Sequence, residues 1–164
     1  MIASEILADA YFREGFQVQA FPSFGVERRG APVTAFLRID KEFIYLRSMI
    51  YRADFGVVLS PDIINAPTFK QSIKPDAALL VNSGKRIPGL SQFKTSYVDA
   101  VAIALEFDLG TEAQPLVNTA ILGAFAKISG DLKIENLLLA VEKSVPFKAE
   151  QNLQAAKKAY ESVN

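Results

Sequence analysis

The chain has 164 residues, of which 50% are hydrophobic, so it is long enough to form one domain, over residues 1–164, with a core of its own. Lys plus Arg and Asp plus Glu number 18 each, so no net charge attracts it to nucleic acid or to an anionic membrane. His and Cys are absent. That composition excludes a thiolate nucleophile, a Ser-His-Asp triad, a Cys/His zinc site and a cysteine-ligated iron–sulfur cluster built from this chain alone.

The first residues carry neither a basic segment nor an apolar core of the kind found in signal peptides. No later apolar run approaches the roughly 18 residues that cross a bilayer. A chain without cysteine also fits a reducing compartment. We therefore expect a cytoplasmic protein that makes no use of a membrane.

The first quarter of the chain alternates between helix and strand signals. Apolar residues recur at helical spacing from Ile2, and Gly15 stands where a left-handed residue would close that helix. Residues 17–21 are typical of a short strand that ends before a proline. Residues 33–39 and 43–47 each alternate with a period of two across a polar turn. These two segments are predicted to form an antiparallel strand pair.

Two continuous apolar runs, residues 55–59 and 77–82, are typical of parallel strands that are covered by helices on both faces. Residues 68–73 between them could supply one crossover. Residues 95–98 indicate a third strand of this kind, which leads into a helix over residues 101–109. The middle of the chain therefore predicts a mostly parallel sheet.

The last third of the chain is predicted to be helical. Asn118 or Thr119 is a suitable N-cap for an apolar helix over residues 120–128. Two further helices are expected, one that begins at Asp131 and one over residues 150–163. Strands and helices that alternate in this way, with one antiparallel pair inserted, indicate an α/β fold.

Three segments resemble the gamma subunit of the thiamine-diphosphate-dependent 2-oxoacid:ferredoxin oxidoreductases. They are residues 3–8, ASEILA; residues 21–33, FPSFGVERRGAPV; and residues 117–127, VNTAILGAFAK. The similarity extends in order over nearly the whole chain, which makes it specific. The middle segment is closer to pyruvate and 2-oxoisovalerate members than to 2-oxoglutarate members, and members that act on aromatic 2-oxo acids remain an alternative.

The resemblance implies a Rossmann-like, doubly wound domain inside a larger assembly. Alpha, beta and delta partner subunits would hold thiamine diphosphate, Mg and the iron–sulfur clusters. The assembly would decarboxylate a 2-oxo acid oxidatively with CoA, giving acyl-CoA, carbon dioxide and reduced ferredoxin. Within it, the resemblance implies that this chain is noncatalytic, binds no cofactor by itself and helps to bind CoA and to close over the thiamine site.

The sequence departs from the family at its start, because a strand and a glycine-rich phosphate loop usually precede the helix that begins here at Ile2. We expect that the sequence is shortened; the alternative is that a neighbouring subunit covers the sheet edge left open. The departure weakens the case for independent phosphate binding.

The candidate site combines two segments. In the first, a carboxylate and two guanidiniums lie in a loop fixed by prolines and glycines, which would suit an anionic ligand or a subunit contact. From residue types alone an internal ion pair that holds the loop is favoured, whereas the resemblance favours a contact near the active site. In the second, a helix N-terminus could face CoA, although plain capping explains the same residues. The candidate residues are Ser23, Phe24, Gly25, Glu27, Arg28, Arg29, Gly30, Asn118 and Thr119.

Two rival functions stay open at this point. The chain could be a noncatalytic scaffold module that has kept the fold and lost ligand binding. An independent enzyme that uses Ser or Lys is the least favoured, because the sequence shows no activator for such a nucleophile. Lys85 and Arg86 could also contact CoA phosphates, but the turn around them lacks the glycine spacing of a phosphate loop.

Overall fold

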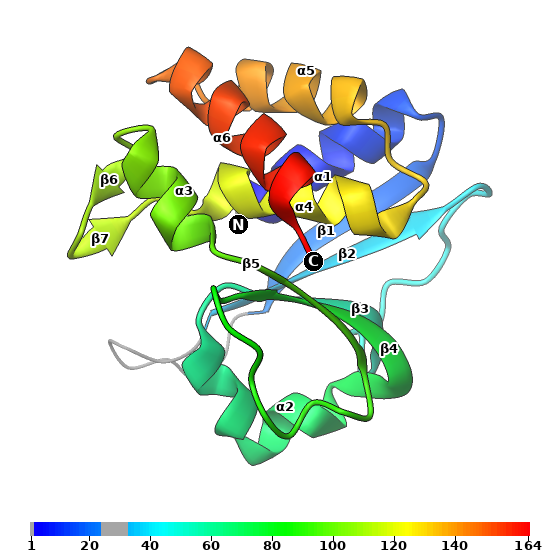
Figure 1. Cartoon of the computed structure of the whole chain (residues 1–164). Helices are drawn as coiled ribbons and strands as arrows, with labels where there is room; N and C mark the ends of the chain where they lie inside the picture. Colours follow the sequence, from blue (N-terminus) through cyan, green and yellow to red (C-terminus); the bar gives the residue numbers. More distant parts are fainter. Residues whose placement is uncertain (1, 24–32) are drawn as a thin grey trace.

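The computed structural model of the chain describes residues 2–23 and 33–164. A layer of helices lies over the strands, and a short helical segment covers the opposite side of the sheet (Figure 1). The helices are α1 (Ile2–Arg13), η1 (Pro61–Asn65), α2 (Pro67–Gln71), α3 (Ala100–Glu106), α4 (Asn118–Ser129), α5 (Ile134–Ser144) and α6 (Ala149–Ser162). The strands are β1 (Gln17–Ser23), β2 (Thr34–Asp40), β3 (Ala53–Val58), β4 (Ile73–Asn82), β5 (Lys94–Val98), β6 (Gly110–Thr111) and β7 (Gln114–Pro115).

Helix α1 confirms the prediction for the start of the chain. It buries Ile6, Leu7, Ala10 and Tyr11, which recur at the spacing of one helix face. Gly15, with φ of 91°, follows its end in the left-handed region that glycine adopts without steric cost. The helix is therefore anchored along one apolar side and ends where the sequence predicted.

Strand β1 is longer than expected, because it continues through Pro22 to Ser23. It pairs antiparallel with β2 in a continuous register from Gln17 opposite Asp40 to Ser23 opposite Thr34. Proline lacks a donor for the ladder, but an N–H on the outer side of a strand is not needed for pairing with β2. The prediction that the strand stops before Pro22 was therefore wrong.

The predicted pairing of residues 33–39 with residues 43–47 was also wrong. The first of these segments forms β2, but its partner is β1, and residues 43–47 are not a strand. Their backbone is held instead by a side chain: the guanidinium of Arg38 donates to the carbonyl oxygens of Leu46 at 3.4 Å and Ser48 at 2.5 Å. Period-two alternation predicts extended backbone, but it does not identify the partner.

Strands β3, β4 and β5 form the parallel sheet that the apolar runs predicted, in that order. Alternate residues of β4 face two different cores. Leu80 packs in the core beneath the helical layer, whereas Leu79 and Val81 pack with Phe69 of α2 on the other face. Burial on both faces explains why the strand lacks a polar alternation. The mixed α/β class, with a mostly parallel sheet and antiparallel pairs, is confirmed.

Helix α4 is the most deeply placed helix, with every residue from Thr119 to Ala126 buried. Neither Asn118 nor Thr119 caps it: the helix begins at Asn118, its N-cap is Val117, and no side chain bonds to the cap. That prediction was wrong because the hydroxyl of Thr119 is used in a tertiary contact with α6. Helices α5 and α6 confirm the two helices expected at the end of the chain, although α5 begins three residues after Asp131. The helix expected over residues 101–109 is α3, which ends earlier, at Glu106.

Candidate functional site

The two ends of the candidate loop are brought together by the antiparallel pair β1–β2. Ser23 lies opposite Thr34, and Pro22 lies opposite Ala35, so the strand ends on either side of residues 24–32 lie next to each other. Of the candidates on this loop, the structure describes the strand position of Ser23. The other candidates lie outside the described residues: Phe24, Gly25, Glu27, Arg28, Arg29 and Gly30.

Aromatic and charged side chains pack at the base of this hairpin. The rings of Phe21 and Phe36, from facing strand positions, are 5.6 Å apart between centroids. The guanidinium of Arg38 lies 5.3 Å from the Phe21 ring centroid, a favourable cation–π distance. It also donates to Oε1 of Gln19 at 2.8 Å. These contacts hold β1 and β2 together below the loop.

Thr119 is built into the contact between α4 and α6. Its side chain is only 3% exposed, and its Oγ1 donates a hydrogen bond to Oδ1 of Asn152 at 2.5 Å. Asn152 in turn donates from Nδ2 to the backbone carbonyl of Lys148 at 2.9 Å. Because each of these buried polar groups has a partner, Thr119 fixes the start of α4 against α6.

Asn118, the neighbouring candidate, is placed differently. Its side chain is half-buried, and within residues 2–23 and 33–164 it has no hydrogen-bond partner. The start of α4 also lacks a side-chain cap. Backbone N–H groups in the first turn of a helix have no partner within the helix, and the helix dipole favours a negative group beside them. The side-chain amide of Asn118 and the first-turn N–H groups can therefore donate hydrogen bonds to an acceptor group of another molecule.

Asn82, at the carboxyl end of β4, is a buried polar residue that the sequence analysis did not select. Its Nδ2 donates to the carbonyl oxygen of Leu59 at 2.9 Å, and its Oδ1 accepts from the backbone N–H of Ala100 at 2.9 Å. One side chain thus links the end of β3, the end of β4 and the start of α3. An asparagine that follows an apolar run was the available signal for this role.

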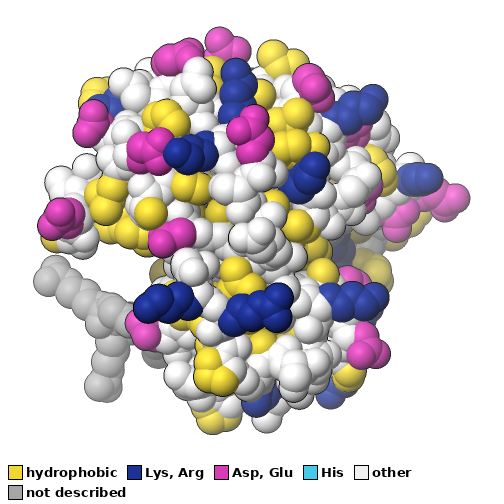
Figure 2. Space-filling model, in the orientation of Figure 1, with side chains coloured by type: hydrophobic (Ala, Val, Ile, Leu, Met, Phe, Trp, Pro, Cys, Tyr) yellow, Lys and Arg dark blue, Asp and Glu magenta, His cyan; other side chains and the backbone are white. Residues whose placement is uncertain are grey.

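The turn after β4 presents charge to solvent. Lys85 and Arg86 are exposed, and the hydroxyl of Ser83 donates to the carbonyl oxygen of Lys85 at 2.7 Å. Residues 53–98 contain five basic and three acidic side chains. Figure 2 shows Lys and Arg side chains in a row across this part of the molecule, whereas both signs are mixed over the helical layer.

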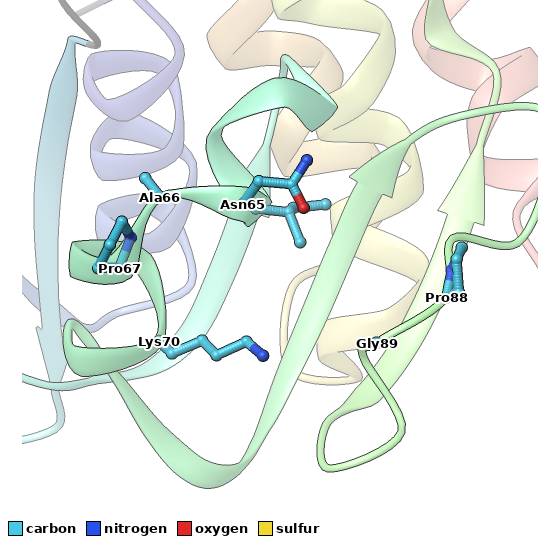
Figure 3. A pocket seen from close by; sticks show the side chains of 7 residues that line it. Asn65, Ala66, Pro67, Lys70, Pro88 and Gly89 are labelled. Atoms are coloured by element: carbon cyan, nitrogen blue, oxygen red, sulfur yellow. The ribbon is translucent and has the colours of Figure 1, made fainter.

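A cavity of about 260 Å³ lies on the α2 side of the sheet. Asn65 and Lys70 border it from η1 and α2, and Pro88 and Gly89 border it from the connection between β4 and β5 (Figure 3). None of the described candidate residues lines this cavity. The cavity is therefore separate from Ser23, Asn118 and Thr119.

In residues 2–23 and 33–164, no group of three His, Cys, Asp or Glu side chains is arranged to hold a metal ion. No helix in this same part of the chain combines the length and apolar character needed to span a bilayer.

Comparison with known proteins identifies the relatives of this chain. The family model for pyruvate ferredoxin/flavodoxin oxidoreductase matches residues 1–162. The chain is 45% identical to the pyruvate/ketoisovalerate oxidoreductases common subunit gamma of Pyrococcus furiosus over 166 residues, which covers 97% of this chain and 88% of that protein. It is 41% identical to the pyruvate synthase subunit PorC of Methanothermobacter thermautotrophicus, covering 98% and 87%.

A solved structure gives the same result. The pyruvate oxidoreductase subunit PorC of Thermotoga maritima superposes with a TM-score of 0.78 at 31% identity, covering 99% of this chain and 88% of that one. The match extends over the helical layer and the parallel sheet described above. The chain therefore belongs to the pyruvate ferredoxin/flavodoxin oxidoreductase family, as a gamma-type subunit of a multi-subunit oxidoreductase.

Proposed function

We propose that this chain is the noncatalytic gamma subunit of a thiamine-diphosphate-dependent pyruvate or 2-oxoisovalerate:ferredoxin oxidoreductase, in which it supports CoA binding and subunit assembly. The complex converts a 2-oxo acid and CoA into acyl-CoA and carbon dioxide and passes two electrons to ferredoxin. Alpha, beta and delta subunits hold thiamine diphosphate, Mg and the iron–sulfur clusters. The complex works in the cytoplasm.

One observation carries the proposal: a chain that matches the family over residues 1–162 has neither His nor Cys. Iron–sulfur clusters need cysteine thiolates, and proton transfer at neutral pH most often uses imidazole. Those groups must then come from partner subunits. What this chain can contribute is shape, fixed charge and backbone hydrogen-bond donors.

The charges suited to CoA belong to the segment that follows β1 and precedes β2 in the sequence. Arg28 and Arg29 provide two guanidiniums, each able to make planar bidentate contacts with a phosphate group. Glu27 would orient them. The neighbouring residues would shape the loop that presents them; these are Ser23, Phe24, Gly25 and Gly30.

The start of α4 supports a second contact. The first-turn N–H groups and the half-buried Asn118 would face a carbonyl or phosphate oxygen of CoA. Thr119 takes part indirectly, because its hydrogen bond to Asn152 fixes the direction of the helix. Loop and helix together would orient CoA without any covalent step on this chain.

Reconstitution of the complex from purified subunits tests this function. We expect no acyl-CoA formation from the chain alone and a loss of CoA-dependent 2-oxo acid oxidation when it is omitted. Activity of the isolated chain, or full activity of an assembly without it, would refute the noncatalytic role. The genes beside this one should encode a thiamine-binding chain and a ferredoxin-like chain.

The contribution to CoA binding is tested separately. Arg28→Ala/Arg29→Ala should raise the KM for CoA about a hundredfold or more, since the two lost charge-assisted hydrogen bonds contribute about 1.5–3 kcal/mol each. Lys133→Ala/Lys157→Ala, which also removes two exposed cations, should leave that KM within about twofold. An unchanged KM in the arginine variant would favour a scaffold without ligand binding.

A further inference from the structure

The segment between β2 and β3 exposes an unusual amount of apolar surface. Of the 12 large hydrophobic side chains exposed in the described residues, five lie within residues 43–51, which we call the aromatic strip. Tyr45, Tyr51 and Phe43 are 84%, 78% and 63% exposed. Single exposed apolar residues are ordinary, but a contiguous group of this kind marks an interaction surface.

The strip has no strand partner in the described residues. Phe43 and Tyr45 are exposed two positions apart, and Leu46, Met49 and Tyr51 continue the exposed apolar surface along the segment. Within residues 2–23 and 33–164, the backbone of residues 43–52 makes no backbone–backbone hydrogen bond. One edge of the strip is thus available to another extended chain, as in β-strand addition.

Arg38 fixes the strip before any partner arrives. Its guanidinium bonds to the carbonyl oxygens of Leu46 and Ser48, two positions apart, and to the side chain of Gln19 on β1. Carbonyl groups two residues apart point the same way in an extended chain, so one side chain can hold both. A segment that is already ordered loses less conformational entropy when it binds.

The charge on the strip indicates the kind of partner. Lys41, Arg47 and Arg52 are exposed, and none of them forms an ion pair within the described part of the chain. Glu42 is the one acidic residue in the segment 41–52. A partner that presents carboxylates would complement this charge. A second copy docked through the same face would bring the arginines of both copies together, which is unfavourable.

We propose that the aromatic strip docks another subunit of the same oxidoreductase, which presents an apolar groove rimmed with carboxylates. Phe43, Tyr45 and Tyr51 fill the groove, and Arg47 and Arg52 face the carboxylates. The inference rests on the proposed function, because it needs a hetero-oligomeric complex. It identifies which surface of this chain makes the contact and what chemistry the partner surface has.

Association with the remaining subunits tests the strip. Tyr45→Ser/Tyr51→Ser should weaken binding of the full chain to the other subunits about tenfold or more, as measured by sedimentation. Arg47→Glu/Arg52→Glu should do the same, with a loss that shrinks as salt is raised. Equal affinity of these variants and the unaltered chain would overturn the proposal.

Matched controls separate docking from general surface effects. Phe147→Ser removes a side chain that is 74% exposed outside the strip, and Lys157→Glu reverses an exposed charge on α6. Both controls should bind within about twofold of the unaltered chain. Matching thermal unfolding curves would show that every variant is folded. A loss in the controls as large as in the strip variants would also overturn the proposal.

Photo-cross-linking identifies the occupant. A photoreactive phenylalanine at Tyr45 in the assembled complex should cross-link to another subunit, whereas the same group at Phe147 should not. Cross-links only between copies of this chain, or none at Tyr45, would refute the docking. If the unaltered chain fails to enter the complex, the proposed function fails as well; if it enters and the strip variants enter equally, only the strip is refuted.

Discussion

Gly123 on α4 lies against the backbone carbonyl of Ala156 on α6, so closely that a Cβ placed on residue 123 would overlap that oxygen. Small residues surround this point, with Ala155 and Ala159 on α6 buried completely. The two helices therefore meet backbone to backbone. This contact also sets where the start of α4, with its candidate site, lies in the molecule.

Gly123→Ala should destabilise the protein by about 3 kcal/mol, because the added methyl group meets rigid backbone and not a movable side chain. Urea unfolding would measure the change. Gly130→Ala is the control: it adds a methyl group in open space, at φ of 75°, and should cost only about 1 kcal/mol. Equal losses would contradict the close approach of the helices.

Asn82→Ala should cost about 2–3 kcal/mol, since it leaves the carbonyl of Leu59 and the N–H of Ala100 without their partner. The side chain is 7% exposed, so water cannot readily replace it. Chemical denaturation gives the measurement. Asn65→Ala, at an exposed position, should change stability by less than about 0.5 kcal/mol. A neutral Asn82→Ala variant would show that the link between β3, β4 and α3 is dispensable.

Tyr11 should make stability depend on alkaline pH. Burial, followed by the hydrogen bond to Asp131 at 2.6 Å, raises the pKa of the Tyr11 hydroxyl well above its ordinary value of 10.0. The folded state then keeps the proton after the unfolded state has lost it. Its stabilisation is fully present below pH 10 and falls by about 1.4 kcal/mol per pH unit above it. Denaturant unfolding of the wild type and Tyr11→Phe between pH 9 and 11 should show this slope in the wild type alone.

Substitutions of Thr119 and Asn118 should affect different properties, namely stability and the KM for CoA. Thr119→Val removes the hydrogen bond to the buried Asn152 and should reduce stability by about 1–3 kcal/mol. Asn118→Ala should leave the unfolding free energy nearly unchanged and raise the KM for CoA in the reconstituted complex. The two measurements are thermal unfolding and the CoA dependence of the rate. A stable Thr119→Val variant with a raised KM would instead assign the ligand contact to Thr119.

The elements predicted correctly are those whose signal is local. Helix α1 follows from apolar spacing and a terminal glycine, and strands β3, β4 and β5 follow from continuous apolar runs. Each of these patterns depends on residues only a few positions apart. They therefore indicate an element without knowledge of its neighbours.

Two of the three errors concern partners distant in sequence, whereas the third placed the end of β1 one residue before Pro22. Residues 43–47 alternate as a strand does, but β2 pairs with β1, and Arg38 holds the segment through the carbonyl oxygens of Leu46 and Ser48. Thr119 has the side chain of an N-cap, yet it bonds to Asn152, 33 residues away. In each case a tertiary hydrogen bond engages polar groups that the local pattern had assigned to strand pairing or to helix capping. For the candidate site, the sequence predicts Arg28 and Arg29 by residue type. The position of Asn82 after an apolar run is a local signal, but its partners Leu59 and Ala100 are distant in sequence.

The amino-acid composition and the ordered motifs suffice to show that imidazole and thiol groups are absent and to which family the chain belongs, because neither depends on folding. The sequence also determined most of the elements, since helix and strand periods are local. Only the tertiary structure shows which strand pairs with β2, which polar groups form hydrogen bonds inside the fold and which aromatic residues stay exposed. Those outcomes follow from competition between distant groups for the same hydrogen bonds and the same buried space, and only the folded chain settles that competition.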